Sequence, residues 1–321
     1  GDGANKWYIH HQGGGWCESD EDCFQRSLTP LGSSSTYPKT SGFNMGYFSR
    51  NASVNPMMYN WNMVFMRYCD GGSFSGAKTT PTIYNGHELH YRGRFVREAM
   101  MADMMNNRGL RDATDVVVSG CSAGGLATYL HADQVAALFD PRRTKVEALP
   151  DSGFFIAYNS PYGDPKYLSA MQWVFTAMNA SSGVNQDCIT HYSPTQDTWH
   201  CMFAQYTSPF IKVPVFPLQS KYDAWQVPNI LGNKSPALVN EYGANFTKII
   251  TDYLLSHQPK NGVFLDACYH HCGAWGDIVI GSDNFDQALA FQQFYSRRPG
   301  QQVIWEQDET YPCEACCHRG Q

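Results

Sequence analysis

One five-residue stretch has residue types and a spacing suited to covalent catalysis. Residues 120–124 read Gly-Cys-Ser-Ala-Gly, with a glycine two positions before and two positions after Ser122. This G-x-S-x-G pattern is typical of a nucleophile elbow, a sharp turn that presents a serine hydroxyl at the start of a helix. Free N–H groups at a helix start favour the negative charge that develops when a serine attacks a carbonyl carbon.

The elements around Ser122 favour this interpretation over a tight turn that merely contains a serine. The valines at 116–118 predict a buried strand, and residues 126–138 predict a helix. Upstream, residues 6–11 read as a strand that runs into three glycines at 13–15. A strand followed by His-x-Gly-Gly-Gly resembles the loop that supplies oxyanion-binding N–H groups in lipases and esterases. We expect that role here, although a flexible glycine turn is the alternative.

A catalytic serine needs a base and an acid, which in α/β-hydrolases follow it along the chain in the order acid, histidine. Among the late histidines, His257 falls in an expected helix and His318 in a cysteine-rich tail. His270 and His271 directly follow an expected strand at 262–266 and are therefore favoured as the base.

Two aspartates remain open as the acid. Asp223 follows an expected strand at 213–219, as the template requires, and is the preferred candidate. Asp151 also follows a strand-like run, at 146–149, and also lies between the serine and the histidines. Its alternative role is a structural cap of the next turn.

Strands and helices alternate through most of the 321 residues. Further strands are expected at 60–67 and helices at 88–107 and 241–257. The pattern predicts one α/β domain over residues 1–321, with a mainly parallel central sheet flanked by helices. Residues 158–205 show no clear alternation and are expected to form an insertion or cap tied by a Cys188–Cys201 disulfide.

Bulk properties narrow the functional classes. A net charge of −6 provides no basic face for nucleic acid, and the chain has no apolar stretch of the length of a membrane span. Eleven cysteines indicate an oxidising compartment, so we expect a secreted protein whose signal peptide is absent from this chain. Four N-x-[ST] patterns, at Asn51, Asn179, Asn233 and Asn245, agree with a secreted glycoprotein.

Five motifs, in this order, resemble those of the pectin acetylesterase family, which also includes the Wnt deacylase Notum. They are Gly14-Gly15-Trp16-Cys17, Arg67-Tyr68-Cys69-Asp70-Gly71, the stretch from Gly120 to Ala127, Tyr222-Asp223-Ala224-Trp225-Gln226 and Cys268-Tyr269-His270-His271-Cys272. The resemblance covers essentially the whole chain. Cys121, directly before Ser122, matches the plant-type branch of the family. Notum-like chains have a serine at this position instead. The resemblance implies an α/β-hydrolase fold and serine esterase chemistry without cofactor or metal.

The resemblance also implies residue roles. Ser122 is the nucleophile, Asp223 the acid and His271 the base, with oxyanion donors at the N–H groups of Gly14, Gly15 and Ala123. Trp16, Trp225 and His270 are candidate pocket residues, and His270 also remains a competing base.

The implied substrate is an acetylated polysaccharide such as pectin, handled by a monomer that binds neither nucleic acid nor membrane. The alternatives are deacetylation of another polysaccharide such as xylan, Notum-like removal of a palmitoleoyl lipid from a protein, and a catalytically silent carbohydrate-binding protein.

The cysteines carry three further expectations. Cys17 and Cys23 are close enough in sequence to bridge a small loop. Cys121 is expected to be the unpaired eleventh thiol, buried under the elbow. The tail cysteines with His318 fit either zinc or disulfides, and an oxidising compartment favours disulfides.

Overall fold

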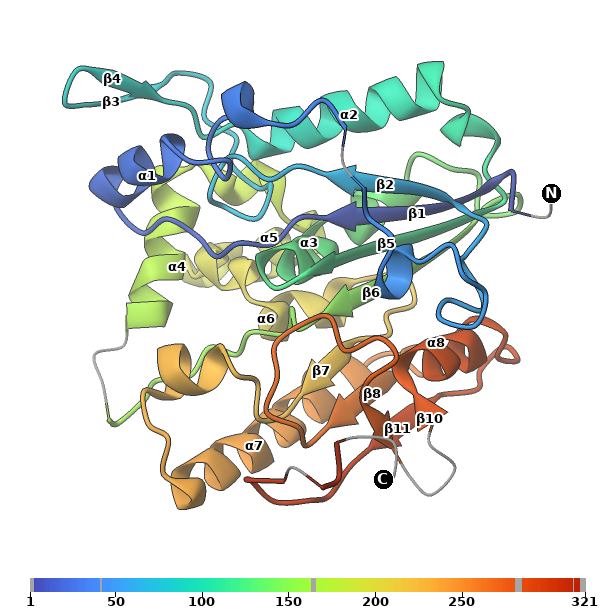
Figure 1. The fold of residues 1–321 in the computed structure, drawn as a ribbon. Helices are drawn as coiled ribbons and strands as arrows, with labels where there is room; N and C mark the ends of the chain where they lie inside the picture. Colours follow the sequence, from blue (N-terminus) through green and yellow to red (C-terminus); the bar gives the residue numbers. More distant parts are fainter. Residues whose placement is uncertain (1–2, 41, 163–165, 281–284, 314, 318–321) are drawn as a thin grey trace.

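A seven-stranded sheet in the order β11-β8-β7-β6-β5-β1-β2 forms the centre of the protein (Figure 1). The computed structural model describes residues 3–40, 42–162, 166–280, 285–313 and 315–317. Every pairing between neighbouring strands of this sheet is parallel. Its strands are β1 (Lys6–His11), β2 (Asn62–Met66), β5 (Asp115–Cys121), β6 (Lys145–Asp151), β7 (Leu218–Ser220), β8 (Val263–Asp266) and β11 (Ile304–Glu306).

Helices cover both faces of the sheet. They are α1 (Asp20–Ser27), α2 (Gly93–Asn107), α3 (Ala123–Ala136), α4 (Lys166–Ala177), α5 (Gln186–Tyr192), α6 (Ala204–Thr207), α7 (Pro236–Ile250) and α8 (Gln287–Tyr295). Two small antiparallel hairpins pair β3 (Thr82–Tyr84) with β4 (His87–Leu89) and β9 (Val279–Ile280) with β10 (Phe285–Asp286). The expected α/β class with a mainly parallel sheet is confirmed.

Side chains that alternate along the strands separate two hydrophobic cores. In β5, Val116 and Val118 join the core that contains α2, α3, α4 and α7, whereas Val117 joins the core that contains α8. Successive side chains of a strand point to opposite faces of the sheet, so a run of valines buries both faces at once. This explains why a continuous apolar run, and not an alternating one, marks β5, a strand in the interior of the sheet.

Several boundaries differ from the sequence expectation for local reasons. The helix expected from residue 88 begins at Gly93, because His87–Leu89 forms a hairpin strand after the Asn85-Gly86 turn. Both turn residues have positive φ, as a tight hairpin requires. The helix expected from 241 begins five residues earlier, at Pro236, a residue favoured in the first turn of a helix.

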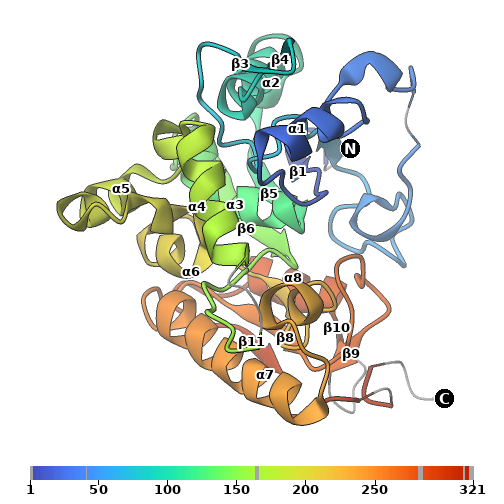
Figure 2. The ribbon, with the colours of Figure 1, turned by 90° about the vertical axis from the view of Figure 1, so that its left-hand side faces the viewer.

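The segment between β6 and β7 forms the expected insertion. It carries α4, α5 and α6, and the Cys188–Cys201 disulfide closes part of it. The strands end on the left-hand side of Figure 1, and Figure 2, which turns that side to the viewer, shows α4 beside the ends of β5 and β6. The insertion therefore flanks the edge where the carboxyl ends of parallel strands present loops.

Glycine is required where β5 turns into α3. A Cβ added at Gly124 would lie 2.1 Å from the carbonyl oxygen of His11, a backbone atom that cannot swing aside. We expect Gly124→Ala to destabilise the fold by about 1–3 kcal/mol, measured by denaturant unfolding. Gly42→Ala is the matched control, since a Cβ at Gly42 meets no atom within 4 Å. Equal losses of stability in the two variants would contradict this prediction.

Candidate active site

Ser122 occupies a strained turn between β5 and α3. Its φ of 60° and ψ of −125° lie outside the regions that non-glycine residues ordinarily adopt. The Ser122 N–H donates to the carbonyl oxygen of Asp151 at 2.9 Å, which helps to hold this conformation. The geometry is that of a nucleophile elbow, with the serine at the N-terminus of a helix.

His271 is hydrogen-bonded to Asp223, and each of the two groups comes from a loop that follows a strand. The Nδ1 atom of His271 lies 2.8 Å from Oδ2 and 3.0 Å from Oδ1 of Asp223. The carboxylate is buried and also accepts the N–H groups of Trp225 and Gln226, both at 2.9 Å. The Nε2 atom of His271 has no hydrogen-bond partner among the described residues. This ring therefore has one nitrogen oriented by a carboxylate and the other free to accept a proton.

The glycine loop after β1 is held by its carbonyl groups. Arg26 donates to the carbonyl oxygen of Gly14 at 2.8 Å, and the Tyr68 hydroxyl donates to that of Gly15 at 2.8 Å. Both glycines have positive φ, 132° and 65°. Ala123 is the first residue of α3, where N–H groups have no carbonyl partner within the helix. Gly14 and Gly15 border the same cavity as Ser122, and Ala123 directly follows the serine, so these three N–H groups remain the candidates for an oxyanion hole.

The loops that carry Ser122 and His271 are linked covalently. Cys121, directly before the serine, forms a disulfide with Cys272, directly after the histidine. The expectation that Cys121 is the unpaired thiol is therefore wrong, and the free cysteine is Cys69. Cys121 is the last residue of β5, and the fold places it beside Cys272. No local sequence pattern reveals this proximity, because the two residues are far apart in the chain.

Asp151 reinforces the same junction. Its Oδ2 accepts the N–H of Gly273 at 2.9 Å, while the adjacent Ser152 hydroxyl accepts the N–H of Cys272 at 2.8 Å. Burial raises the pKa of Asp151, and the hydrogen bond from Gly273 opposes that rise. Asp151 therefore contacts the backbone of the loop that follows His271. These contacts are structural, in agreement with the alternative hypothesis that Asp151 caps a turn.

His270 faces a different carboxylate from its neighbour. Its Nε2 lies 3.1 Å from both oxygens of Asp266, which is completely buried at the end of β8. Burial alone would lower the pKa of His270, but the Asp266 carboxylate outweighs it and raises this pKa to about 9. His270 is therefore a charged partner of Asp266 at neutral pH. It borders a separate hollow near Tyr269 and Tyr311.

A cavity of about 1370 Å³ opens beside Ser122 and His271. The glycine loop 13–15 and Trp225 border it, and its far wall comes from residues 42–49 and from Trp275 to Asp277. Trp16 packs behind Trp225. His10 also borders the cavity, but burial lowers its pKa to about 3, and its Nδ1 lies 2.9 Å from the Tyr8 hydroxyl. The far wall was not foreseen from the sequence, because a loop rich in glycine and aromatics has no specific motif.

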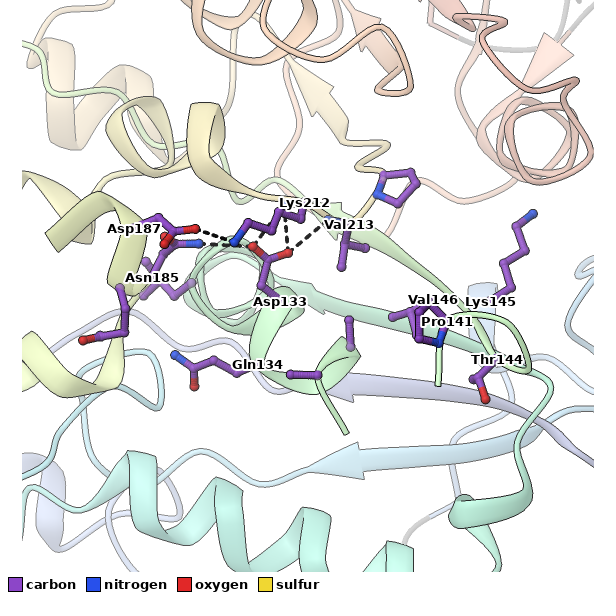
Figure 3. Close-up of a pocket in the computed structure, with 15 residues that line it drawn as sticks. Asp133, Gln134, Pro141, Thr144, Lys145, Val146, Asn185, Asp187, Lys212 and Val213 are labelled. Carbon is purple, nitrogen blue, oxygen red and sulfur yellow. Dashed lines mark hydrogen bonds and ion pairs between the residues drawn. The ribbon is translucent and has the colours of Figure 1, made fainter. Parts of the chain in front are cut away.

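A second hollow, of about 640 Å³, lies at the amino-terminal end of β6, beside the second half of α3 (Figure 3). Several of its charged side chains are paired with each other or hydrogen-bonded to the backbone. Asp133 accepts the N–H groups of Lys212 and Val213, and Lys212 pairs with Asp187 at 2.6 Å (Figure 3). The described residues that line this hollow include no serine and no histidine, in contrast to the cavity beside Ser122.

The remaining cysteines form disulfides. Cys17–Cys23 and Cys188–Cys201 are paired as expected, and Cys268–Cys317 and Cys313–Cys316 tie the tail. Disulfides therefore take up the tail thiols that a zinc site would need; His318 lies outside the described residues. No helix within the described part of the chain is long and apolar enough to cross a membrane.

Comparisons with known proteins agree with this arrangement. A family model described as pectinacetylesterase matches residues 1–318. Pectin acetylesterase 5 of Arabidopsis thaliana is 32% identical over 343 residues, covering 99% of this chain and 78% of the relative. Palmitoleoyl-protein carboxylesterase notum2 of Xenopus laevis is 26% identical, covering 89% of this chain and 61% of the relative. These relatives carry the names of carboxylic ester hydrolases.

A solved structure extends the comparison to the fold. The Wnt deacylase Notum from Drosophila superposes with a TM-score of 0.84 at 23% identity, covering 99% of this chain and 91% of that chain. The match confirms the expected α/β-hydrolase architecture.

The Cys121–Cys272 link predicts a catalytic defect when it is removed. In a Cys121→Ser, Cys272→Ser double variant, Ser122 and His271 lose a covalent constraint on their separation. A displacement of about 1 Å in a reacting group can cost roughly 100-fold in rate, so we expect a fall of that order in kcat for an aryl acetate. The matched control is Cys188→Ser, Cys201→Ser, which removes a disulfide in the insertion. If both double variants lose kcat equally, the link has no special role.

The His270–Asp266 pair predicts a loss of stability at alkaline pH. Because the pKa of folded His270 is raised to about 9 from an ordinary value near 6.5, its contribution is fully present below about pH 6.5 and is lost as pH rises through 9. Over this window the free energy of unfolding should fall by up to roughly 1.4 kcal/mol per pH unit. Urea unfolding at several pH values measures it, and His270→Gln should flatten the curve. A parental curve that is already flat between pH 6.5 and 9 would refute the assignment.

Proposed function

Because this chain belongs to the pectinacetylesterase family, we propose that it is a serine esterase that removes O-acetyl groups from an acetylated cell-wall polysaccharide such as pectin. The observation that carries the proposal is that Ser122, in its strained turn, and His271, paired with Asp223, border one large cavity. Its relatives include proteins named pectin acetylesterase at 31–33% identity.

The first half of the proposed reaction acylates the serine. His271 Nε2 takes the proton from the Ser122 hydroxyl as the serine oxygen attacks the acetyl carbonyl carbon. The carbonyl oxygen becomes an oxyanion and accepts hydrogen bonds from the N–H groups of Gly14, Gly15 and Ala123. The bond to the sugar oxygen then breaks, and His271 returns the proton to that oxygen, so a sugar alcohol leaves and an acetylated serine remains.

The second half regenerates the serine. A water molecule gives a proton to His271 and attacks the acetyl carbon, and the Ser122 oxygen leaves with that proton while acetic acid is released. Asp223 holds the His271 ring in one orientation and balances the positive charge that it carries in each transition state. The proposal needs no cofactor and no metal.

The disulfides support a proposal about where the enzyme acts. Five disulfides suit an oxidising compartment, so we propose that the protein acts outside the cell as a secreted monomer. Its partner is the polysaccharide itself. Acetylated xylan is the nearest alternative substrate, and acetate release from matched samples of acetylated pectin, xylan and mannan distinguishes them.

Removal of the serine hydroxyl should abolish the activity. Loss of the nucleophile typically lowers turnover by a factor on the order of 10⁶, so Ser122→Ala should release no measurable acetate from acetylated pectin or from an aryl acetate. Ser256→Ala, on the exposed surface after α7, is the matched control. A fluorophosphonate should label the parent and the control but not Ser122→Ala. Labelling and acetate release that persist in Ser122→Ala would refute the proposed nucleophile, and a parent that neither reacts nor releases acetate would indicate a silent binding protein.

A further inference from the structure

One part of the cavity beside Ser122 is bordered by a cluster of packed aromatic rings. The cluster contains four rings from distant parts of the chain, here called the aromatic wall: Trp16, Phe155, Tyr167 and Trp225. Trp16, Phe155 and Tyr167 are buried, whereas Trp225 is only half-buried and borders the cavity. Trp225 is thus the ring of the aromatic wall that borders the cavity.

The rings of the aromatic wall pack against one another. The ring centroid of Trp225 lies 5.2 Å from that of Phe155, 5.6 Å from that of Trp16 and 5.9 Å from that of Tyr167. All three contacts are close to perpendicular, which is a favourable arrangement for aromatic pairs. Trp225 therefore fills space that would otherwise be a recess in front of three buried rings.

The aromatic wall is fixed to the catalytic groups. The indole N–H of Trp16 donates to the Ser73 hydroxyl at 2.8 Å, and this hydroxyl donates to the carbonyl oxygen of Ala123 at 2.8 Å. The backbone N–H of Trp225 donates to Asp223, and the Trp225 ring centroid lies 6.4 Å from that of His271. The wall consequently cannot move away without disturbing the residues on which the proposed reaction depends.

The polymer and the acyl group of a substrate must lie on different sides of the serine. A polysaccharide chain requires an open site, and the open space beside Ser122 is the cavity that residues 42–49 also line. Figure 2 shows α4, which carries Tyr167, on one side of the end of β5, and the loop that includes residues 46–48 on the other. When the sugar oxygen of an ester lies toward that loop, the acyl carbons on the other side of the carbonyl face the aromatic wall.

We infer that Trp225 sets the acyl-chain limit of this enzyme, by filling the recess that a longer acyl chain would occupy and leaving room for an acetyl group. This inference rests on the proposed esterase function and assigns a specificity-determining residue within it. It also separates this chain from a lipid deacylase, which needs a deep apolar recess for its acyl chain.

Truncation of Trp225 should therefore shift specificity toward longer acyl chains. The parent should hydrolyse p-nitrophenyl acetate with a much higher kcat/KM than p-nitrophenyl butyrate or octanoate. In Trp225→Ala the ratio of octanoate to acetate should rise at least about tenfold, since apolar pockets discriminate by roughly that factor for a change of one methylene. Trp225→Phe, which opens less space, should give an intermediate ratio with butyrate favoured over octanoate.

Matched controls separate specificity from a general loss of activity. Trp305→Ala makes the same substitution on the edge strand β11, where the indole stacks on Phe285, and should leave the ratio at the parental value. Fluorophosphonate labelling of each variant shows that Ser122 remains reactive, so a variant that fails to fold is recognised, and Trp225→Phe then carries the test.

The outcomes distinguish this inference from the function on which it rests. If the parent reacts with the fluorophosphonate and hydrolyses the acetate, but the ratio is unchanged in both Trp225 variants, Trp225 does not set the limit. A parent that hydrolyses octanoate as fast as acetate also overturns the inference while leaving the esterase function intact. A parent that reacts with neither the fluorophosphonate nor any ester refutes the proposed function itself.

Discussion

The junction between the end of β5 and the loop that follows His271 is the constraint on which the candidate active site depends. The Cys121–Cys272 disulfide closes it covalently, and Asp151 closes it by hydrogen bonds, with its carbonyl group on the Ser122 N–H and its carboxylate on the Gly273 N–H. A serine with positive φ is costly to hold, and such conformations persist only where the surroundings over-determine them. The same few contacts thus hold Ser122 in its strained conformation and position the loop that carries His271.

The sheet explains why this junction is rigid. β5 lies between β1 and β6, and both cores of the protein meet on its valines. The glycine loop directly follows β1, and the turn after Asp151 directly follows β6. Because β1 and β6 flank β5, these two segments lie on either side of Ser122. In a parallel sheet the carboxyl ends of strands meet at one edge, which brings together residues that are more than a hundred positions apart in sequence.

Residue spacing alone predicted the locally encoded part of the site, whereas the choice of Asp223 and His271 also needed the family resemblance. The elbow at Ser122 and the glycines after β1 are recognisable because a tight turn and a close backbone approach restrict the residue types at fixed spacings. The disulfide of Cys121 was not foreseen, and of the aromatic wall only Trp16 and Trp225 were named, as candidate pocket residues. Both features depend on which loops meet in space, and single aromatic or cysteine residues carry no spacing signal. The Asn85-Gly86 hairpin was also overlooked, although its dipeptide is a local signal.

The two adjacent histidines show why residue type and position in the chain were insufficient to choose the base. His270 and His271 follow the same strand and each pairs with an aspartate, Asp266 or Asp223. The second ring nitrogen has no hydrogen-bond partner among the described residues in either histidine, so the pairs differ in what the side chain faces. The pKa of His270 is raised to about 9, which keeps it protonated and unable to accept a proton at neutral pH, and it lies outside the cavity. A base must instead be unprotonated and within reach of the serine. His271 borders the same cavity as Ser122 and has an unpartnered Nε2, so geometry favours it over a neighbour of identical chemistry.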